Sequence, residues 1–163
     1  MASSWIAQID AWLRTNRPEY HAALRPGVRE RDIDAFEREF GLTLPPPARA
    51  LFAWRDGQTR GNYANFVDNW MFPPLHDVAD RKRMLDGMIG YDFEDPSWWR
   101  REWVPLFDNG GGDCLCIDLT EEGAGRVVVF WHDAADRPVE SPGVGPWLRA
   151  LCESMESGAY EVF

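Results

Sequence analysis

The sequence lacks several features that would assign it to a class at once. No apolar run in this 163-residue chain approaches the roughly 20 residues needed to cross a bilayer. The first ten residues contain neither a basic region nor a continuous apolar segment, so we expect no secretory signal. There is no internal repeat and no low-complexity linker, which argues against a repeat protein or a two-domain chain.

Cysteine and histidine are scarce, with three of each in the chain. Cys114 and Cys116 would lie on the same face of one strand, where they are poorly placed to bridge each other, so we expect small buried thiols. A zinc site would need two further ligands at suitable spacing, and none is evident. These observations favour a reducing cytoplasm and predict neither a metal nor a cofactor.

Residue patterns typical of catalysis are also few. No serine or cysteine lies in a motif such as GxSxG, and the glycines at 110–112 lack the Lys and Ser or Thr of a phosphate-binding loop. His132 and Asp133 could be a base with its carboxylate, or the polar end of a strand. Carboxylates that could pair for acid–base hydrolysis are present, although an acidic surface supplies such pairs by chance: Asp92, Glu94, Asp95, Asp108 and Asp113. We therefore predict no catalytic residues.

The chain is rich in negative charge and in aromatic side chains. The formal net charge is −10, from 27 acidic and 17 basic residues, and there are nine Trp and nine Phe. Nucleic acid and anionic membranes should repel such a chain. A basic partner should associate with it quickly, because complementary fields raise association rates, although an acidic surface can also serve solubility alone.

The stretch from Trp103 to Asp133 predicts the centre of the fold. Three runs rich in β-branched and aromatic residues, separated by turn residues, predict an antiparallel meander over 103–107, 114–119 and 127–131. The middle run would place Leu115 and Ile117 on one face and the two cysteines on the other. The last run is apolar on both faces, which predicts a central strand covered on both sides. The glycines at 110–112 either fix the hairpin or present amides and carboxylates to a partner.

Apolar residues at helical spacing predict helices before and after this region. The predicted helices begin behind the possible N-caps Ser3 and Ser4, near Val28, after Pro45 to Pro47, at Asp77, and around Trp147, Leu148, Leu151 and Met155. We expect the first three to end near Pro18, Gly41 and Asp56. The fourth, over residues 77–89, would place Val78, Arg81, Met84, Leu85 and Met88 near one face. Residues 66–72 are a strand candidate. The prediction is one α+β domain over residues 1–163, with a mainly antiparallel sheet and N- and C-terminal helices packed on it.

The tract from Asp92 to Trp99 combines carboxylates with two adjacent tryptophans. Neighbouring residues beside Pro96 do not readily both face the core, so we predict that Trp98 or Trp99 is substantially exposed. A large aromatic ringed by charge is the kind of residue that dominates an interface. The alternative is that both indoles cover the open face of the sheet. The candidate partner-binding residues are Asp92, Glu94, Asp95, Trp98, Trp99, Asp108 and Asp113.

A set of short motifs follows one order along residues 25–151. They are Ile33-x-x-Phe36-Glu37, Gly41-x-x-Leu44-Pro45, Leu51 with Asp56-Gly57-Gln58, Trp103-Val104-Pro105-Leu106, Gly111-Gly112-Asp113-x-Leu115-Cys116-x-Asp118, Gly125-x-Val127-x-x-Phe130-x-His132-Asp133 and Trp147-Leu148. Together they resemble the SUKH superfamily of Smi/Knr type. Two departures are the missing Ser or Thr cap before Glu30, and Glu121-Glu122 where the family often has a proline. We expect the motif residues to be mainly structural: Glu37, Pro45, Asp56, Gly57, Trp103, Pro105, Gly111, Gly112, Asp113, Asp118, His132 and Asp133.

The resemblance implies an α+β fold. For bacterial members it implies a non-enzymatic immunity protein that binds and neutralises a toxin of a polymorphic or contact-dependent system, often a nuclease. The expected partner is thus a basic protein toxin in the cytoplasm, and no nucleic acid, membrane or cofactor is expected. The resemblance makes no prediction about whether the chain is a monomer or an oligomer. A fungal branch is linked to cell-wall synthesis and signalling. The alternative is therefore a regulatory, scaffold or sugar-binding module, the last through exposed tryptophan, and an acid–base hydrolase is the third reading.

Overall fold

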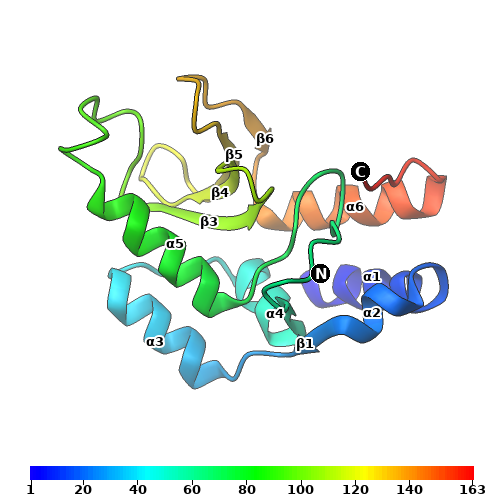
Figure 1. Ribbon diagram of the computed structural model, residues 1–163. Helices are drawn as coiled ribbons and strands as arrows, with labels where there is room; N and C mark the ends of the chain where they lie inside the picture. The colour runs from blue at the N-terminus through cyan, green and yellow to red at the C-terminus, as the bar shows by residue number, and fades with distance from the viewer.

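Four antiparallel strands lie over a layer of helices in the computed structural model, which describes residues 1–163 (Figure 1). The strands are β3 (Trp103–Asp108), β4 (Cys114–Asp118), β5 (Arg126–Phe130) and β6 (Val139–Ser141), and they lie side by side in chain order. This sheet is the predicted meander with one short strand added. The central place of β5 and the α+β class are both confirmed.

Six helices and a second, two-stranded sheet complete the fold. The helices are α1 (Ala2–Asn16), α2 (Pro18–Ala23), α3 (Glu30–Phe40), α4 (Pro46–Trp54), α5 (Leu75–Gly87) and α6 (Val144–Ser157). The small antiparallel sheet pairs β1 (Leu24–Pro26) with β2 (Arg55–Gln58). Helix α1 packs against both α4 and α6, so the first and last helices of the chain lie together beneath the sheet, as Figure 1 shows. None of the helices has both the length and the apolar character that a membrane crossing requires.

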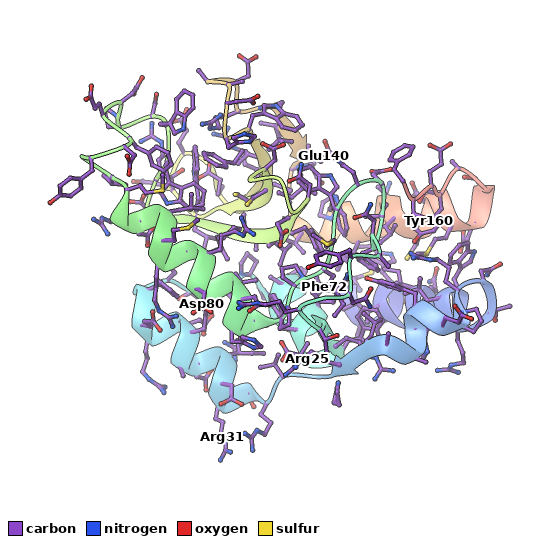
Figure 2. All side chains as sticks on the ribbon, in the orientation of Figure 1. Arg25, Arg31, Phe72, Asp80, Glu140 and Tyr160 are labelled. Carbon is purple, nitrogen blue, oxygen red and sulfur yellow. The ribbon has the colours of Figure 1, made fainter.

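The sheet is buried on both faces because its strands are apolar on both sides. Leu115 and Ile117 point into the main core with the helices, while Cys114 and Cys116 point into a second, smaller core on the opposite face. Phe72 lies in the main core, near the middle of the molecule in Figure 2. The segment that follows α5, residues 88–102, closes the second core. The predicted alternation along β4 is confirmed.

The three cysteines are free and buried, as the strand geometry predicted for the adjacent pair. Burial raises the pKa of the Cys116 thiol well above its usual value. A thiol that stays protonated is a poor nucleophile, so Cys116 acts as a small core residue, and Cys114 is buried in the same core.

The strongest helical patterns gave the right helices. Helix α3 buries Ile33 and Phe36 and ends at Gly41, whose φ of 63° is the left-handed angle expected of a C-terminal glycine. Helix α4 begins with proline in its first turn, where no backbone hydrogen bond is lost. Helix α6 buries the whole predicted stripe, Trp147, Leu148, Leu151 and Met155.

Four predicted details were wrong. Helix α1 starts at Ala2, and neither Ser3 nor Ser4 is its N-cap. Helix α4 ends at Trp54, and Asp56 lies in strand β2. Residues 66–72 form a tight turn, with an isolated bridge between Val67 and Trp70, because Phe66 and Phe72 are buried on either side of it. Helix α5 buries Val78 and Leu85 of the predicted face, but its other buried residues are Leu75, Ala79 and Lys82 in place of Arg81, Met84 and Met88.

Candidate partner-binding surface

The glycine-rich turn between β3 and β4 uses its own polar groups internally. The side-chain Oδ1 of Asn109 accepts hydrogen bonds from the amides of Gly111 (2.9 Å) and Asp113 (3.1 Å). The Asn109 Nδ2 donates to Asp113 Oδ2 (2.9 Å), and the Gly110 amide donates to Asp108 Oδ1 (2.9 Å). Of the two predicted roles, these bonds support the fixed hairpin, because the same amides and carboxylates are not free for a partner.

Two glycines of the turn, Gly110 and Gly112, have positive φ angles of 75° and 106°, which favour glycine. Gly112 has a φ of 106°, and a Cβ placed there would lie 3.1 Å from the His132 ring. Gly111 has no such angle, and the nearest atom to its Cβ would be 3.5 Å away. Gly112 therefore has a conformation that favours glycine, whereas Gly111 does not.

Asp113 also ties the turn to the end of β5. His132 donates its backbone amide to Asp113 Oδ1 (2.9 Å), and its Nδ1 lies 2.7 Å from the same oxygen. Partial burial would raise the pKa of Asp113, but the bonds from His132 outweigh it and lower the pKa. The hydrogen bond to Asp113 likewise raises the pKa of His132. The sequence suggested that the adjacent Asp133 would be the carboxylate partner of His132. In the structure the carboxylate beside the His132 Nδ1 is instead that of Asp113.

These residues also form the one cluster with metal-ligand geometry. Ligand atoms of Asp113, His132 and Asp133 lie within 4.8 Å of one another. Both oxygens of Asp113 already accept hydrogen bonds, one from His132 and one from Asn109. We therefore interpret the cluster as a structural one, whose hydrogen bonds hold the β3–β4 turn against the end of β5.

Asp108 was predicted to contact a partner, and its position is unsuited to that role. It is 7% exposed at the end of β3, where its backbone pairs with Met71. Arg81 of α5 approaches its carboxylate at 3.6 Å. Asp108 therefore joins the sheet to the turn at 66–72 and to α5.

The two tryptophans of the 92–99 tract face different surroundings. Trp99 is 1% exposed and lies in the second core, with its Nε1 donating to Asp86 Oδ1 at 2.8 Å. Trp98 is half-buried beneath the guanidinium of Arg137, 5.0 Å from the ring centroid. The prediction of one substantially exposed indole is therefore wrong, and Trp99 is a packing residue. All nine tryptophans are buried or half-buried, which removes the basis for sugar binding through exposed tryptophan.

The predicted carboxylates of the same tract are on the surface. Asp92, Glu94 and Asp95 are exposed, and none of them forms a salt bridge. Asp95 accepts hydrogen bonds from the amide (2.8 Å) and hydroxyl (2.7 Å) of Ser97, which lower its pKa. Asp92 and Glu94 remain free to meet a cation of a partner.

Three carboxylates of the ordered motifs hold local structure. Glu37 accepts a bond from the Leu44 amide (2.6 Å) and pairs with Arg49. Asp56 accepts a bond from the amide of Leu75, the first residue of α5 (2.8 Å). Asp118 receives the amide and hydroxyl of Thr120 and the Arg126 guanidinium, which close the β4–β5 turn.

The remaining motif residues are determined by packing. Trp103 lies in the second core, edge to face with Trp99 at 5.5 Å. Pro105 occupies edge strand β3 beside an irregularity in register, where proline's missing amide is tolerated. Pro45 precedes the first turn of α4. Gly57 has a φ of 60°, and a Cβ there would lie 2.5 Å from the Phe72 carbonyl oxygen.

A groove of about 510 Å³ lies beside the glycine-rich turn. It runs between the loop at 59–63 and α5, and Tyr63 and Met84 are exposed at it. The carboxylate of Asp77 in this groove is neutralised by Arg60 at 2.6 Å. The groove is thus mixed in charge.

Net charge is distributed unequally along the chain. Residues 1–87 contain 12 acidic and 12 basic residues and so have no net charge. Residues 88–163 contain 15 acidic and 5 basic residues, and this excess of acidic residues accounts for the whole net charge of −10. In the first part, ten of the 12 carboxylates lie within 4.0 Å of a cationic side chain. In the second part, three of the 15 do, and a fourth, Asp113, pairs with the His132 imidazole. The other eleven are exposed: Asp92, Glu94, Asp95, Glu102, Glu121, Glu122, Asp133, Asp136, Glu140, Glu156 and Glu161.

The structure defines a single α+β domain whose net negative charge is carried by residues 88–163. The model of the SMI1 / KNR4 family (SUKH-1) matches residues 27–150, and the chain belongs to that family. It is 23% identical to a glucan synthesis regulatory protein of Neurospora crassa, over 99% of this chain and 40% of that protein. It is also 47% identical over 47 residues to the F-box protein SKIP16 of Arabidopsis thaliana, across 29% of this chain and 11% of that protein. The chain thus spans less than half the length of both relatives.

Proposed function

We propose that this chain is a non-enzymatic immunity protein that neutralises a basic protein toxin, such as a nuclease, by binding it. The observation that carries the proposal is the placement of the whole net charge on residues 88–163, with eleven exposed carboxylates that have no ionic partner. A carboxylate already paired inside the chain must lose that pair before it can serve a partner. These eleven have no internal pair to lose.

A nuclease is a suitable partner for such a surface. Its cleft has to be basic, because phosphate neutralisation supplies most of the affinity for nucleic acid. A carboxylate-rich surface would be drawn to that cleft and would cover it, and the opposed fields would speed association. A stable complex should bury roughly 1,200–2,000 Å².

The proposal of binding without catalysis is supported by the roles of the candidate acid–base groups. Asp108 is buried at a strand end, and Asp113 holds both His132 and Asn109. Each group therefore has a structural task that explains its presence. The same is true of His132, which serves the hairpin.

Co-expression tests the proposal. A bacterium that expresses the toxin gene found beside the gene of this chain should stop growing, and cytoplasmic co-expression of this chain should restore growth. A catalytically inactivated toxin domain should then purify together with this chain. If growth stops as quickly with the chain as without it, for every neighbouring toxin candidate, the proposal fails.

A regulatory module of cell-wall synthesis is the second candidate, and one observation favours it. The similarity to the Neurospora protein covers 99% of this chain. For such a module, deletion of the gene should change the glucan content of the wall and leave toxin sensitivity unchanged. The immunity protein should give the opposite pair of results.

A further inference from the structure

The segment that leaves α5 forms a tight, pre-organised tip. The amides of Tyr91 (3.1 Å) and Phe93 (3.0 Å) both donate to the Met88 carbonyl, and the Gly90 amide donates to the Phe93 carbonyl at 2.9 Å. Phe93 is buried in the second core, where its ring meets Phe130 edge to face at 6.2 Å. The backbone on either side of Tyr91 is therefore held by the fold, so little ordering remains to be done on binding.

Tyr91 at this tip is 80% exposed, although the neighbouring Phe93 is buried. Asp92 and Glu94 flank it and are exposed as well. Tyrosine supplies a large, amphipathic contact area with few rotatable bonds, and such residues often carry much of an interface's energy. The aromatic anchor that the sequence placed at Trp98 or Trp99 thus has a better candidate seven or eight residues earlier.

Arg137 joins this tract to the loop between β5 and β6. Its Nη2 donates to the Trp98 carbonyl (2.8 Å), and its Nη1 donates to the carbonyls of Ala134 (2.6 Å) and Asp136 (2.7 Å). The guanidinium lies over the rings of Phe130 (4.6 Å) and Trp98 (5.0 Å). Unlike most arginines of the chain, it has no carboxylate within 4.0 Å, so its whole fork serves to connect the two segments.

We propose that the tip at 90–95 and the loop at 132–136 form the surface that receives the basic partner, with Tyr91 as its anchor; Arg137 joins the loop to the tract that follows the tip, at Trp98. The inference rests on the proposed function. The occupant that fits is the nucleic-acid cleft of a basic protein, which offers cationic walls and a slot where a base would stack. Asp92 and Glu94 meet the cations, and the Tyr91 ring enters the slot. Figure 1 shows the tract after α5 and the β5–β6 loop projecting from the same end of the molecule.

Two tyrosines of equal exposure provide the test. Tyr63 is also 80% exposed, but it lies in the part of the chain with no net charge. The probe is the catalytically inactivated toxin domain encoded beside this chain, titrated against the full-length chain. Tyr91→Ser should raise the Kd at least about 30-fold, and Tyr63→Ser should change it less than about threefold. Both variants should unfold at the same urea concentration as the parent, because each side chain is exposed.

Arg137 is tested as a positioning residue by amide hydrogen exchange on the unbound chain. Arg137→Ala should speed exchange at residues 91–99 while leaving α1 and α6 unchanged, and it should weaken binding about tenfold. Arg137→Lys, which keeps the charge and loses the fork, should fall between Arg137→Ala and the parent.

The outcomes separate the two proposals. If the parent binds no toxin domain, the proposed function fails and this inference fails with it. If the parent binds, and Tyr91→Ser binds equally well or Tyr63→Ser loses as much affinity, this inference is overturned while the proposed function stands. Uniformly faster amide exchange in Arg137→Ala would show a general loss of stability. That result would contradict the role of Arg137 as a residue that positions the proposed binding surface.

Discussion

Gly111 and Gly112 are neighbours in one turn, yet only Gly112 needs to be glycine. Its φ is 106°, and its Cβ would press on the His132 ring at 3.1 Å. Gly112→Val should lower the free energy of unfolding by roughly 1–3 kcal/mol, and Gly111→Val should change it by less than about 0.5 kcal/mol. Urea denaturation of both variants measures the difference. Equal midpoints for the two would contradict this account of the turn.

The pair of His132 and Asp113 predicts a pH dependence. A raised pKa of His132 means that the folded chain holds this proton more tightly, so its contribution is present below about pH 6.5 and is lost as the pH rises through the folded pKa. The lowered pKa of Asp113 means that its contribution is lost as the pH falls below about 4. The parent should therefore exceed His132→Ala in unfolding free energy by more at pH 5.5 than at pH 8.5, measured by urea denaturation. A difference that grows towards pH 8.5 would contradict the pairing.

For single residues, the sequence indicated which side chains are important better than it indicated which other side chains they contact. It singled out His132 and the carboxylates around the turn, but the bond to Asp113 crosses 19 positions and depends on the register of the strands. Trp98 and Trp99 were recognised as a pair that could not share one environment. Which of them lies inside depends on Asp86, the acceptor for the Trp99 indole, and no local pattern reveals that contact.

Helix α5 owes its place to a buried lysine. Lys82 is fully buried, and its Nζ donates to the carbonyls of Arg101 and Trp103 and pairs with Asp86 at 3.1 Å. Burial lowers the pKa of Lys82, and the Asp86 carboxylate opposes the shift. The lysine thereby fastens the start of β3 to the helix.

Replacing Lys82 should be costly for this reason. Lys82→Met would leave the Asp86 carboxylate without its cation and the carbonyls of Arg101 and Trp103 without the lysine donor, so we expect a loss of roughly 3–5 kcal/mol in unfolding free energy. Arg83 is the matched control, because its salt bridge to Glu39 lies on the surface; Arg83→Met should lose less than about 1 kcal/mol. Chemical denaturation compares the two. Similar losses would show that the buried network adds little.

Elements with one strong periodic pattern were the predictable ones. The stripes of α3 and α6 and the alternation in β4 follow from burial on one side, which sequence periodicity records directly. The stripe of α5 was predicted in part: Val78 and Leu85 are buried as expected, but Lys82, whose charge gives no sign of burial, was left out of it. Residues 66–72 have the residue pattern of a strand because Phe66 and Phe72, at the two ends of the turn, are both buried. The spacing of apolar residues alone does not distinguish such a turn from a strand.

For the molecule as a whole, the charge of each segment can be counted from the sequence, but pairing requires the fold. The acidic residues of 1–87 are largely matched by arginines that the helices bring to them, as with Arg49 and its three carboxylate neighbours. In Figure 2, Arg31 lies at the bottom of the view and Glu140 in its upper half. The sequence therefore shows where the net charge lies along the chain, and the fold shows which carboxylates have no cationic neighbour.

The most direct measurement of the central claim is the association rate constant with the inactivated toxin domain, recorded by stopped flow at low and at physiological ionic strength. Two double variants change net charge equally: Asp92→Lys with Glu94→Lys in the acidic part, residues 88–163, and Glu19→Lys with Glu30→Lys in the part without net charge. We predict that the rate constant of the parent falls steeply with salt, since exposed charges are screened beyond roughly 8 Å at physiological ionic strength. The first double variant should slow association about tenfold at low salt, and the second less than about threefold. A rate constant that is independent of salt, or equal losses in the two variants, would contradict the claim that this acidic surface receives the partner.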